Sequence, residues 1–160
     1  MNKNNNENDE LKRFTEQLQK EILERIRKEY SDAVIERWQN PKNFFRMDNP
    51  DGYAKTRGVC GDTMEMFLKV RDGIIQESSF QTDGCGTTIA CGSMATELAH
   101  NKSFNEALAG VSAQEILKRL GGLPEADTHC AQLASETFRR ALADYLYHKK
   151  DSWKKNYRID

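Results

Sequence analysis

The chain opens with a segment of helical periodicity. From residue 11 to residue 30, apolar side chains recur every three or four positions, with Lys, Arg, Glu and Gln between them. The apolar positions are Leu11, Phe14, Leu18, Ile22, Ile26 and Tyr30. This spacing gathers them on one face and predicts an amphipathic helix over about residues 9–29. Met1–Glu10 is almost entirely Asn, Lys, Asp and Glu and is expected to be disordered.

A shorter helix and an irregular stretch come next. Ser31 is a good N-cap for a helix over Asp32–Gln39, which an Asn-Pro pair ends. The stretch Lys42–Lys55 contains the turn sequence Pro50-Asp51-Gly52 and is typical of a loop. A short strand is expected around Ala54–Arg57, just before the first cysteine.

The middle of the chain carries the period of β-strands. Apolar and polar side chains alternate over Met64–Val70, and an extended pattern continues over Ile74–Gln81. Between these runs, Asp72-Gly73 supplies the positive φ angles of a tight turn. The segment therefore predicts an antiparallel hairpin.

Helical patterns return after the hairpin. Residues 87–100 carry an apolar face, and Ser-x-x-Glu capping boxes at Ser103 and Ser112 open two short helices. Gly121-Gly122 ends the second of these, and a long final helix follows a loop. The polar tail from Lys149 is expected to fray. Helices, a small antiparallel sheet and further helices together predict an α+β domain.

Length and composition allow one domain with an extension at each end. The 160 residues carry a net charge of −1, which gives no reason to expect nucleic-acid binding, and no apolar run approaches a membrane span. No apolar segment follows the basic residues near the start, so no signal peptide is visible and a cytoplasmic protein is expected. We divide the chain into an extension (residues 1–29), a folded domain (residues 30–148) and a polar tail (residues 149–160).

Four cysteines are the residues most indicative of chemistry. Cys60 lies in Gly-Val-Cys-Gly-Asp, with Asp62 two positions later. Cys85 lies in Asp-Gly-Cys-Gly, and Cys130 directly follows His129. A disulfide framework is disfavoured, because the chain lacks an export signal and is large enough to bury a core. In a reducing compartment, such cysteines more often bind a metal or react.

The expected topology brings these residues together. Cys60 precedes the first strand of the hairpin and Cys85 follows the second, so both lie with Asp62 at the open end of the hairpin. Cys130 begins the last helix, which could dock at the same end and whose dipole favours a thiolate. Three thiolates at bonding distance bind zinc or iron, with Asp62 or His129 as the fourth ligand. Such a mixed set holds a cluster less firmly than four thiolates, which suits a protein that gives the cluster away.

Several of these residues also have purely structural alternatives. Asp62 could cap a turn, and His129 could bond the backbone at a helix start. Cys91 lies within the helix expected over residues 87–100, so it is interpreted as a small buried residue rather than a second reactive thiol.

A series of motifs supports the interpretation of the cysteines as metal ligands. The motifs are Tyr30-Ser31-Asp32-Ala33-Val34-Ile35, Asn40-Pro41-Lys42-Asn43, Cys60-Gly61-Asp62-Thr63-Met64, the run from Phe80 to Ala90, Thr96-Glu97 and Leu123-Pro124 followed by His129-Cys130. In this order and spacing they closely resemble the IscU/NifU-type iron–sulfur cluster assembly scaffold. The resemblance covers about residues 30–147.

The resemblance implies both a fold and a function. The fold would be α+β, with helices packed on a small three-stranded antiparallel sheet and the N-terminal amphipathic helix as an addition. The function would be that of a scaffold rather than an enzyme. A labile 2Fe-2S cluster would be assembled from ferrous iron and persulfide sulfur and passed to apo-proteins. Partners would be a cysteine desulfurase, an electron donor such as ferredoxin and the apo-protein recipients, and homo-oligomer formation stays open.

The resemblance also assigns roles by position. Cys60, Cys85 and Cys130 match the three family cysteines. Asp62 matches the aspartate that makes the cluster labile and can bind metal, and His129 matches the histidine beside the last cysteine. Cys130 is then the candidate first persulfide acceptor, and zinc would occupy the cluster-free site.

The chain departs from the family in three places: one motif, the added helix over residues 9–29, and Cys91, where the family usually has a small residue such as serine. Two other functions compete with the scaffold. Glu125 and Asp127 add acids after Leu123-Pro124, which puts binding to a dedicated heat-shock-type chaperone in doubt. The alternative function is a zinc-bound persulfide acceptor that stimulates a cysteine desulfurase, as in the SufU branch. That branch has an insertion between its second and third cysteines and lacks the preceding histidine, so His129 and the uninterrupted interval favour the scaffold. A structural zinc adaptor is disfavoured because no close pair of cysteines occurs.

Overall fold

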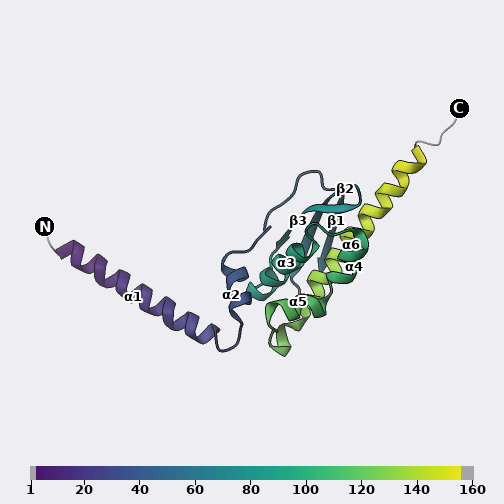
Figure 1. The fold of residues 1–160 in the computed structure, drawn as a ribbon. Helices are drawn as coiled ribbons and strands as arrows, with labels where there is room; N and C mark the ends of the chain where they lie inside the picture. Colours follow the sequence, from purple (N-terminus) through teal and green to yellow (C-terminus); the bar gives the residue numbers. More distant parts are fainter. Residues whose placement is uncertain (1–2, 156–160) are drawn as a thin grey trace.

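The computed structural model describes residues 3–155 and the side chains of residues 8–149. The elements in chain order are α1 (Lys3–Ile26), α2 (Asp32–Gln39), β1 (Gly52–Arg57), β2 (Thr63–Arg71), β3 (Ile74–Thr82), α3 (Gly86–Ala99), α4 (Phe104–Gly110), α5 (Ala113–Leu120), the 3-10 turn η1 (Glu125–Asp127) and α6 (Thr128–Lys155). Figure 1 shows this arrangement, with the helices α2 to α6 gathered around one small sheet. The predicted α+β class is confirmed.

The sheet has three antiparallel strands in the order β1-β2-β3. The predicted hairpin is β2 and β3, and its turn has positive φ at Asp72 (52°) and Gly73 (78°). The short first strand is also present, although it begins at Gly52 and so shortens the predicted loop. The register places Met64 between Thr56 and Thr82, so the ends of all three strands meet on the side of the sheet where the first two cysteines lie.

The core lies between one face of the sheet and two helices. α6 packs against β1 and β2, α3 packs against β3, and the two helices pack against each other. The sheet contributes large side chains that are fully buried, among them Met64, Met66, Leu68 and Phe80. α3 is buried on nearly all sides, so most of its positions hold small residues and it has no single apolar stripe. This burial fixes the start of α3, and hence Cys85, relative to the sheet.

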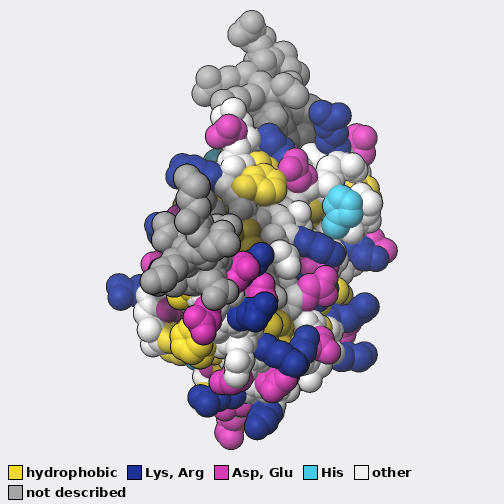
Figure 2. Space-filling view, turned by 90° about the vertical axis from the view of Figure 1, so that its left-hand side faces the viewer, with side chains coloured by type: hydrophobic (Ala, Val, Ile, Leu, Met, Phe, Trp, Pro, Cys, Tyr) yellow, Lys and Arg dark blue, Asp and Glu magenta, His cyan; other side chains and the backbone are white. Residues whose placement is uncertain are grey.

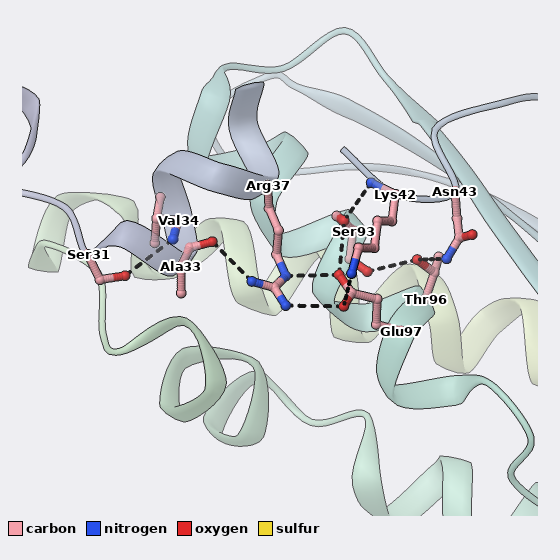
Figure 3. Close-up of polar contacts among 9 residues, drawn as sticks. All are labelled: Ser31, Ala33, Val34, Arg37, Lys42, Asn43, Ser93, Thr96 and Glu97. Carbon is pink, nitrogen blue, oxygen red and sulfur yellow. Dashed lines mark hydrogen bonds and ion pairs between the residues drawn. The ribbon is translucent and has the colours of Figure 1, made fainter. Parts of the chain in front are cut away.

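A polar network joins α2 to α3 (Figure 3). The guanidinium of Arg37 donates two hydrogen bonds to the carboxylate of Glu97, at 2.9 and 3.1 Å. The Asn43 side chain donates to the hydroxyl of Thr96 at 3.1 Å, and Ser93 accepts from the backbone N–H of Lys42 at 3.0 Å. The bidentate contact between Arg37 and Glu97 is stronger than a hydrogen bond between neutral groups. The Thr96-Glu97 motif therefore holds the chain before β1 against α3.

The two ends of the chain are more helical than expected. α1 begins at Lys3, so the expected disorder of Met1–Glu10 is wrong from Lys3 onward, and residues 1–2 lie outside the description. α6 runs to Lys155, so the expected fraying from Lys149 is wrong up to that point, and residues 156–160 lie outside it. Once a helix is nucleated, each added residue gains a hydrogen bond at little cost, which lets polar sequence extend it.

α1 projects away from the sheet (Figure 1). Four side chains of its apolar stripe are exposed, namely Leu11, Phe14, Leu18 and Ile22. Leu11 is 61% exposed and Phe14 is 58% exposed. On the face shown in Figure 2, acidic and basic side chains intermingle around small hydrophobic patches, in keeping with the near-zero net charge. Within the described residues, no helix combines the length and apolar character needed to span a bilayer.

Candidate functional site

The start of α3 and the start of α6 bring two cysteines together. Cys85 is the N-cap of α3, and Cys130 lies in the first turn of α6. The hydroxyl of Thr87 lies 2.9 Å from the Cys85 sulfur and 3.5 Å from the Cys130 sulfur. These two thiols are 45 positions apart in the sequence, and the Thr87 side chain of α3 links them. The predicted meeting of Cys85 and Cys130 is therefore present.

A second hydroxyl adds the predicted carboxylate to this group. Thr88 donates a hydrogen bond to Asp62 Oδ2 at 2.9 Å. Its oxygen also lies 3.4 Å from the Cys130 sulfur and 3.7 Å from the Cys85 sulfur. Asp62 thus faces the thiols, and the hydroxyl that it accepts from belongs to α3 rather than to its own turn. The simple turn-capping alternative does not describe this contact.

The close approach of Asp62 depends on Gly84. A Cβ atom at Gly84 would lie 2.5 Å from Asp62 Oδ2 and 2.8 Å from the Cβ of Thr88. Both distances are shorter than ordinary contacts between such atoms. The glycine before Cys85 therefore makes room for the carboxylate and the threonine behind it.

Thr87 and Thr88 are the site residues that sequence reasoning missed. Both stand in the first turn of α3, and side chains in a helix lean toward its N-terminus. Two hydroxyl residues directly after a Cys-Gly helix start therefore point back at the cysteine. That pattern was visible in the sequence as a signal for thiol-directed hydrogen bonds.

Cys60 occupies a different environment. It is exposed, in the turn between β1 and β2, beside Val59 that is 93% exposed. Among the side chains of residues 8–149, no three of Cys, His, Asp or Glu lie close enough together to hold a metal ion. The role of Cys60, Asp62, Cys85, His129 and Cys130 as a joint ligand set stays a prediction.

The three remaining thiols differ in acidity. Partial burial raises the pKa of Cys85, but hydrogen bonds from the hydroxyls and backbone N–H groups of Thr87 and Thr88 outweigh it, so the pKa lies below the ordinary thiol value. Burial raises the pKa of Cys130, and the same hydroxyls offset only part of the increase. The expectation that the helix start would favour a thiolate at Cys130 is wrong, because the sulfur is buried. The lowered pKa belongs to Cys85 at the other helix start.

Cys91 is fully buried, as the sequence predicted. Burial raises its pKa well above the ordinary thiol value, and Cys130 and Cys85 add to the effect when they are thiolates. A thiol of this kind is protonated at neutral pH and packs as a small apolar group.

The loop before Cys130 is held by an aromatic residue from the other end of the domain. Tyr30 donates a hydrogen bond to Asp127 Oδ2 at 2.7 Å, which raises the pKa of its phenol to about 12. Two residues after Asp127, the Nε2 atom of His129 lies 3.6 Å from the Cys130 sulfur. The imidazole is therefore directed at the thiol of Cys130.

Fold and site together define a class: a small α+β domain that holds thiols, a carboxylate and an imidazole at one end of its sheet. The chain belongs to the family described as NifU-like N terminal domain, whose model matches residues 29–152. The whole of α1 lies outside the match.

Two relatives with similar sequences are named as iron-sulfur cluster assembly scaffold proteins. The chain is 41% identical over 132 residues to the iron-sulfur cluster assembly scaffold protein IscU 1 of Archaeoglobus fulgidus, covering 82% of this chain and 81% of that protein. It is 40% identical over 121 residues to the iron-sulfur cluster assembly scaffold protein IscU of Escherichia coli K12, covering 72% of this chain and 93% of that protein.

Solved structures confirm the fold. A scaffold protein for the SUF system from Fervidobacterium islandicum superposes with a TM-score of 0.59 at 19% identity, covering 71% of this chain and 96% of that one. The N-terminal part of a NifU-like protein from Brucella abortus gives a TM-score of 0.55 at 21% identity, covering 75% and 94%.

Proposed function

We propose that this protein is a scaffold on which a labile 2Fe-2S cluster is assembled and from which it passes to apo-proteins. The observation that carries the proposal is the meeting of Cys85, Cys130 and Asp62 around the hydroxyl of Thr88. Two soft thiol ligands beside a hard carboxylate suit a cluster that is held and then released. The names of the relatives from Archaeoglobus fulgidus and Escherichia coli support the same role.

The iron ligands in this proposal are Cys60, Cys85 and Cys130, with Asp62 or His129 completing the set. Cys60 would join when the exposed turn between β1 and β2 moves toward the start of α3. The same donors fit zinc in the cluster-free protein, since zinc accepts Cys, His and Asp ligands.

Cys130 is the candidate sulfur acceptor. Its thiolate would attack the terminal sulfur of a persulfide on a cysteine desulfurase, forming a new S–S bond while the donor cysteine leaves as a thiolate. Each sulfur so delivered then takes up an electron pair to become sulfide. The ferrous ions supply part of these electrons, and an electron donor such as ferredoxin supplies the rest. Since Cys130 is 1% exposed, its acceptor role requires the start of α6 to move when the desulfurase docks.

Anaerobic reconstitution with ferrous iron, cysteine and a desulfurase tests the proposal. The wild type should develop the visible absorption of a 2Fe-2S cluster, and Cys60→Ala, Cys85→Ala and Cys130→Ala should each lose it. Cys91→Ala is the matched control and should keep the absorption, because its thiol is buried and protonated. Asp62→Ala should retain the cluster longer than the wild type. A wild-type protein that binds zinc tightly, accepts persulfide and forms no cluster would instead support the sulfur-relay alternative.

A further inference from the structure

The hydroxyl of Thr88 is surrounded by more acceptors than it has protons. Asp62 Oδ2, the Cys130 sulfur and the Cys85 sulfur lie 2.9, 3.4 and 3.7 Å from its oxygen. We propose that Thr88 is a positioning residue that holds the Asp62 carboxylate against the two thiols and thereby tunes how firmly the site binds its metal cargo. This inference rests on the proposed function for its biological meaning, but its geometry belongs to the cluster-free protein.

The hydroxyls of Thr87 and Thr88 contact different sets of groups. Thr87 reaches Cys85 and Cys130, and its described contacts include no carboxylate. Thr88 reaches the same two sulfurs and also Asp62, which comes from a loop on the other side of the site. Thr88 therefore connects the carboxylate to the thiols, whereas Thr87 connects the thiols to each other.

The surroundings make this contact directional. Thr88 is fully buried, so water does not compete for its hydroxyl. The close packing of Gly84 against both Thr88 and Asp62 limits where the carboxylate can lie. A hydroxyl has one proton, and an ionised carboxylate is a stronger acceptor than a neutral thiol. Donation to Oδ2 fixes the side chain of Asp62 and leaves Oδ1 free to face a metal ion.

The same contact positions a loop. Asp62 stands two residues after Cys60 in the exposed connection between β1 and β2, while Thr88 stands on the rigid start of α3. Loss of the hydroxyl would release the Asp62 carboxylate. Metal binding would then have to order this side chain, which lowers the affinity of the site for the metal. The effect should vanish when Asp62 is absent, because the hydroxyl then has no carboxylate to hold.

Cobalt binding to the cluster-free protein tests the inference. Thr88→Val, which keeps the shape of the side chain and removes the hydroxyl, should weaken Co²⁺ binding about tenfold, as expected for the loss of one charge-assisted hydrogen bond. In an Asp62→Ala background the same change should have little further effect. The visible bands of bound Co²⁺ in Thr88→Val should shift toward those of Asp62→Ala, and Thr88→Ser should restore the wild-type spectrum and affinity.

A matched control separates this role from general packing. Thr137 is also a fully buried threonine, and its hydroxyl donates to the backbone oxygen of Leu133 within α6 at 2.7 Å. Thr137→Val should leave cobalt affinity unchanged. If Thr88→Val does not fold, Thr88→Ala removes the hydroxyl without adding volume and is judged by the same criteria.

Three results would overturn the inference. They are an equal loss of affinity in the wild-type and Asp62→Ala backgrounds, a failure of Thr88→Ser to restore the spectrum, and an equal loss in Thr137→Val. The two proposals fail separately. A protein that shows the Thr88 to Asp62 coupling with cobalt but never forms a cluster refutes the scaffold alone, whereas one that forms a cluster without this coupling refutes the positioning role alone.

Discussion

Gly84→Ala is the change whose consequence follows most directly from the geometry of the site. The added Cβ would lie 2.5 Å from Asp62 Oδ2 and 2.8 Å from the Cβ of Thr88. The Thr88 Cβ is attached to the buried start of α3 and cannot move aside, so the carboxylate must leave. We expect the variant to fold with reduced stability and to bind metal more weakly, because the hydrogen bond from Thr88 to Asp62 is lost.

The size of the effect can be estimated in two parts. Overpacking in a well-packed core costs about 1–3 kcal/mol, and the half-buried Gly84 should lie at the lower end of that range. Loss of a hydrogen bond to a charged group costs about 1.5–3 kcal/mol, and less here because the displaced Asp62 regains water. The free energy of unfolding should therefore fall by about 3 kcal/mol. Urea unfolding of the cluster-free protein measures this as a lower midpoint at an unchanged slope.

Gly110→Ala is the matched control for this prediction. Nothing lies within 4 Å of a Cβ atom placed at Gly110, which is the last residue of α4. The same substitution should therefore be neutral or stabilise the protein by up to about 1 kcal/mol, because alanine favours a helix. The reasoning is refuted if Gly84→Ala lies within about 0.5 kcal/mol of the wild type, the range of harmless surface changes.

Two further predictions concern titrating side chains. Brief alkylation of the native protein near neutral pH should modify the exposed Cys60 and Cys85 first, Cys130 more slowly and Cys91 only after unfolding, as read by peptide mass spectrometry. Native modification of Cys91 ahead of Cys130 would contradict the described burial. The phenol of Tyr30 is held protonated, with a pKa of about 12 against an ordinary value of 10.0. The contribution of this phenol to stability should be complete at a pH below its ordinary pKa and should disappear as the pH rises through its raised pKa. The free energies of unfolding of the wild type and of Tyr30→Phe should therefore converge at high pH. A difference between them that stays constant with pH would refute this.

The elements that the sequence predicted well are those with local signals. Ser31 caps α2, whose observed bounds are the predicted ones, and Ser103 forms the predicted capping box of α4. The turn at Asp72-Gly73 likewise fixed the hairpin, since few other residues accept its φ angles. Each of these signals lies within a few residues of the structure that it determines.

The parts of the site that the sequence could not supply depend on distant contacts. The hydrogen bond from Thr88 to Asp62 joins residues 26 positions apart, so no local pattern announces it. The acidity of Cys130 depends on how deeply α6 packs, which reversed the expectation drawn from its place at a helix start. The exposure of Cys60 similarly depends on the path of the loop between β1 and β2.

The most direct test of the scaffold proposal is a cluster transfer measurement. The wild-type protein is reconstituted anaerobically with ferrous iron, cysteine and a desulfurase, separated from the reagents, and mixed with an apo-ferredoxin. Our account predicts iron and acid-labile sulfide bound in equal amounts on the protein, followed by their movement to the acceptor as an intact cluster. A protein that emerges with tightly bound zinc and no sulfide, or that keeps its cluster indefinitely beside the acceptor, would contradict the account.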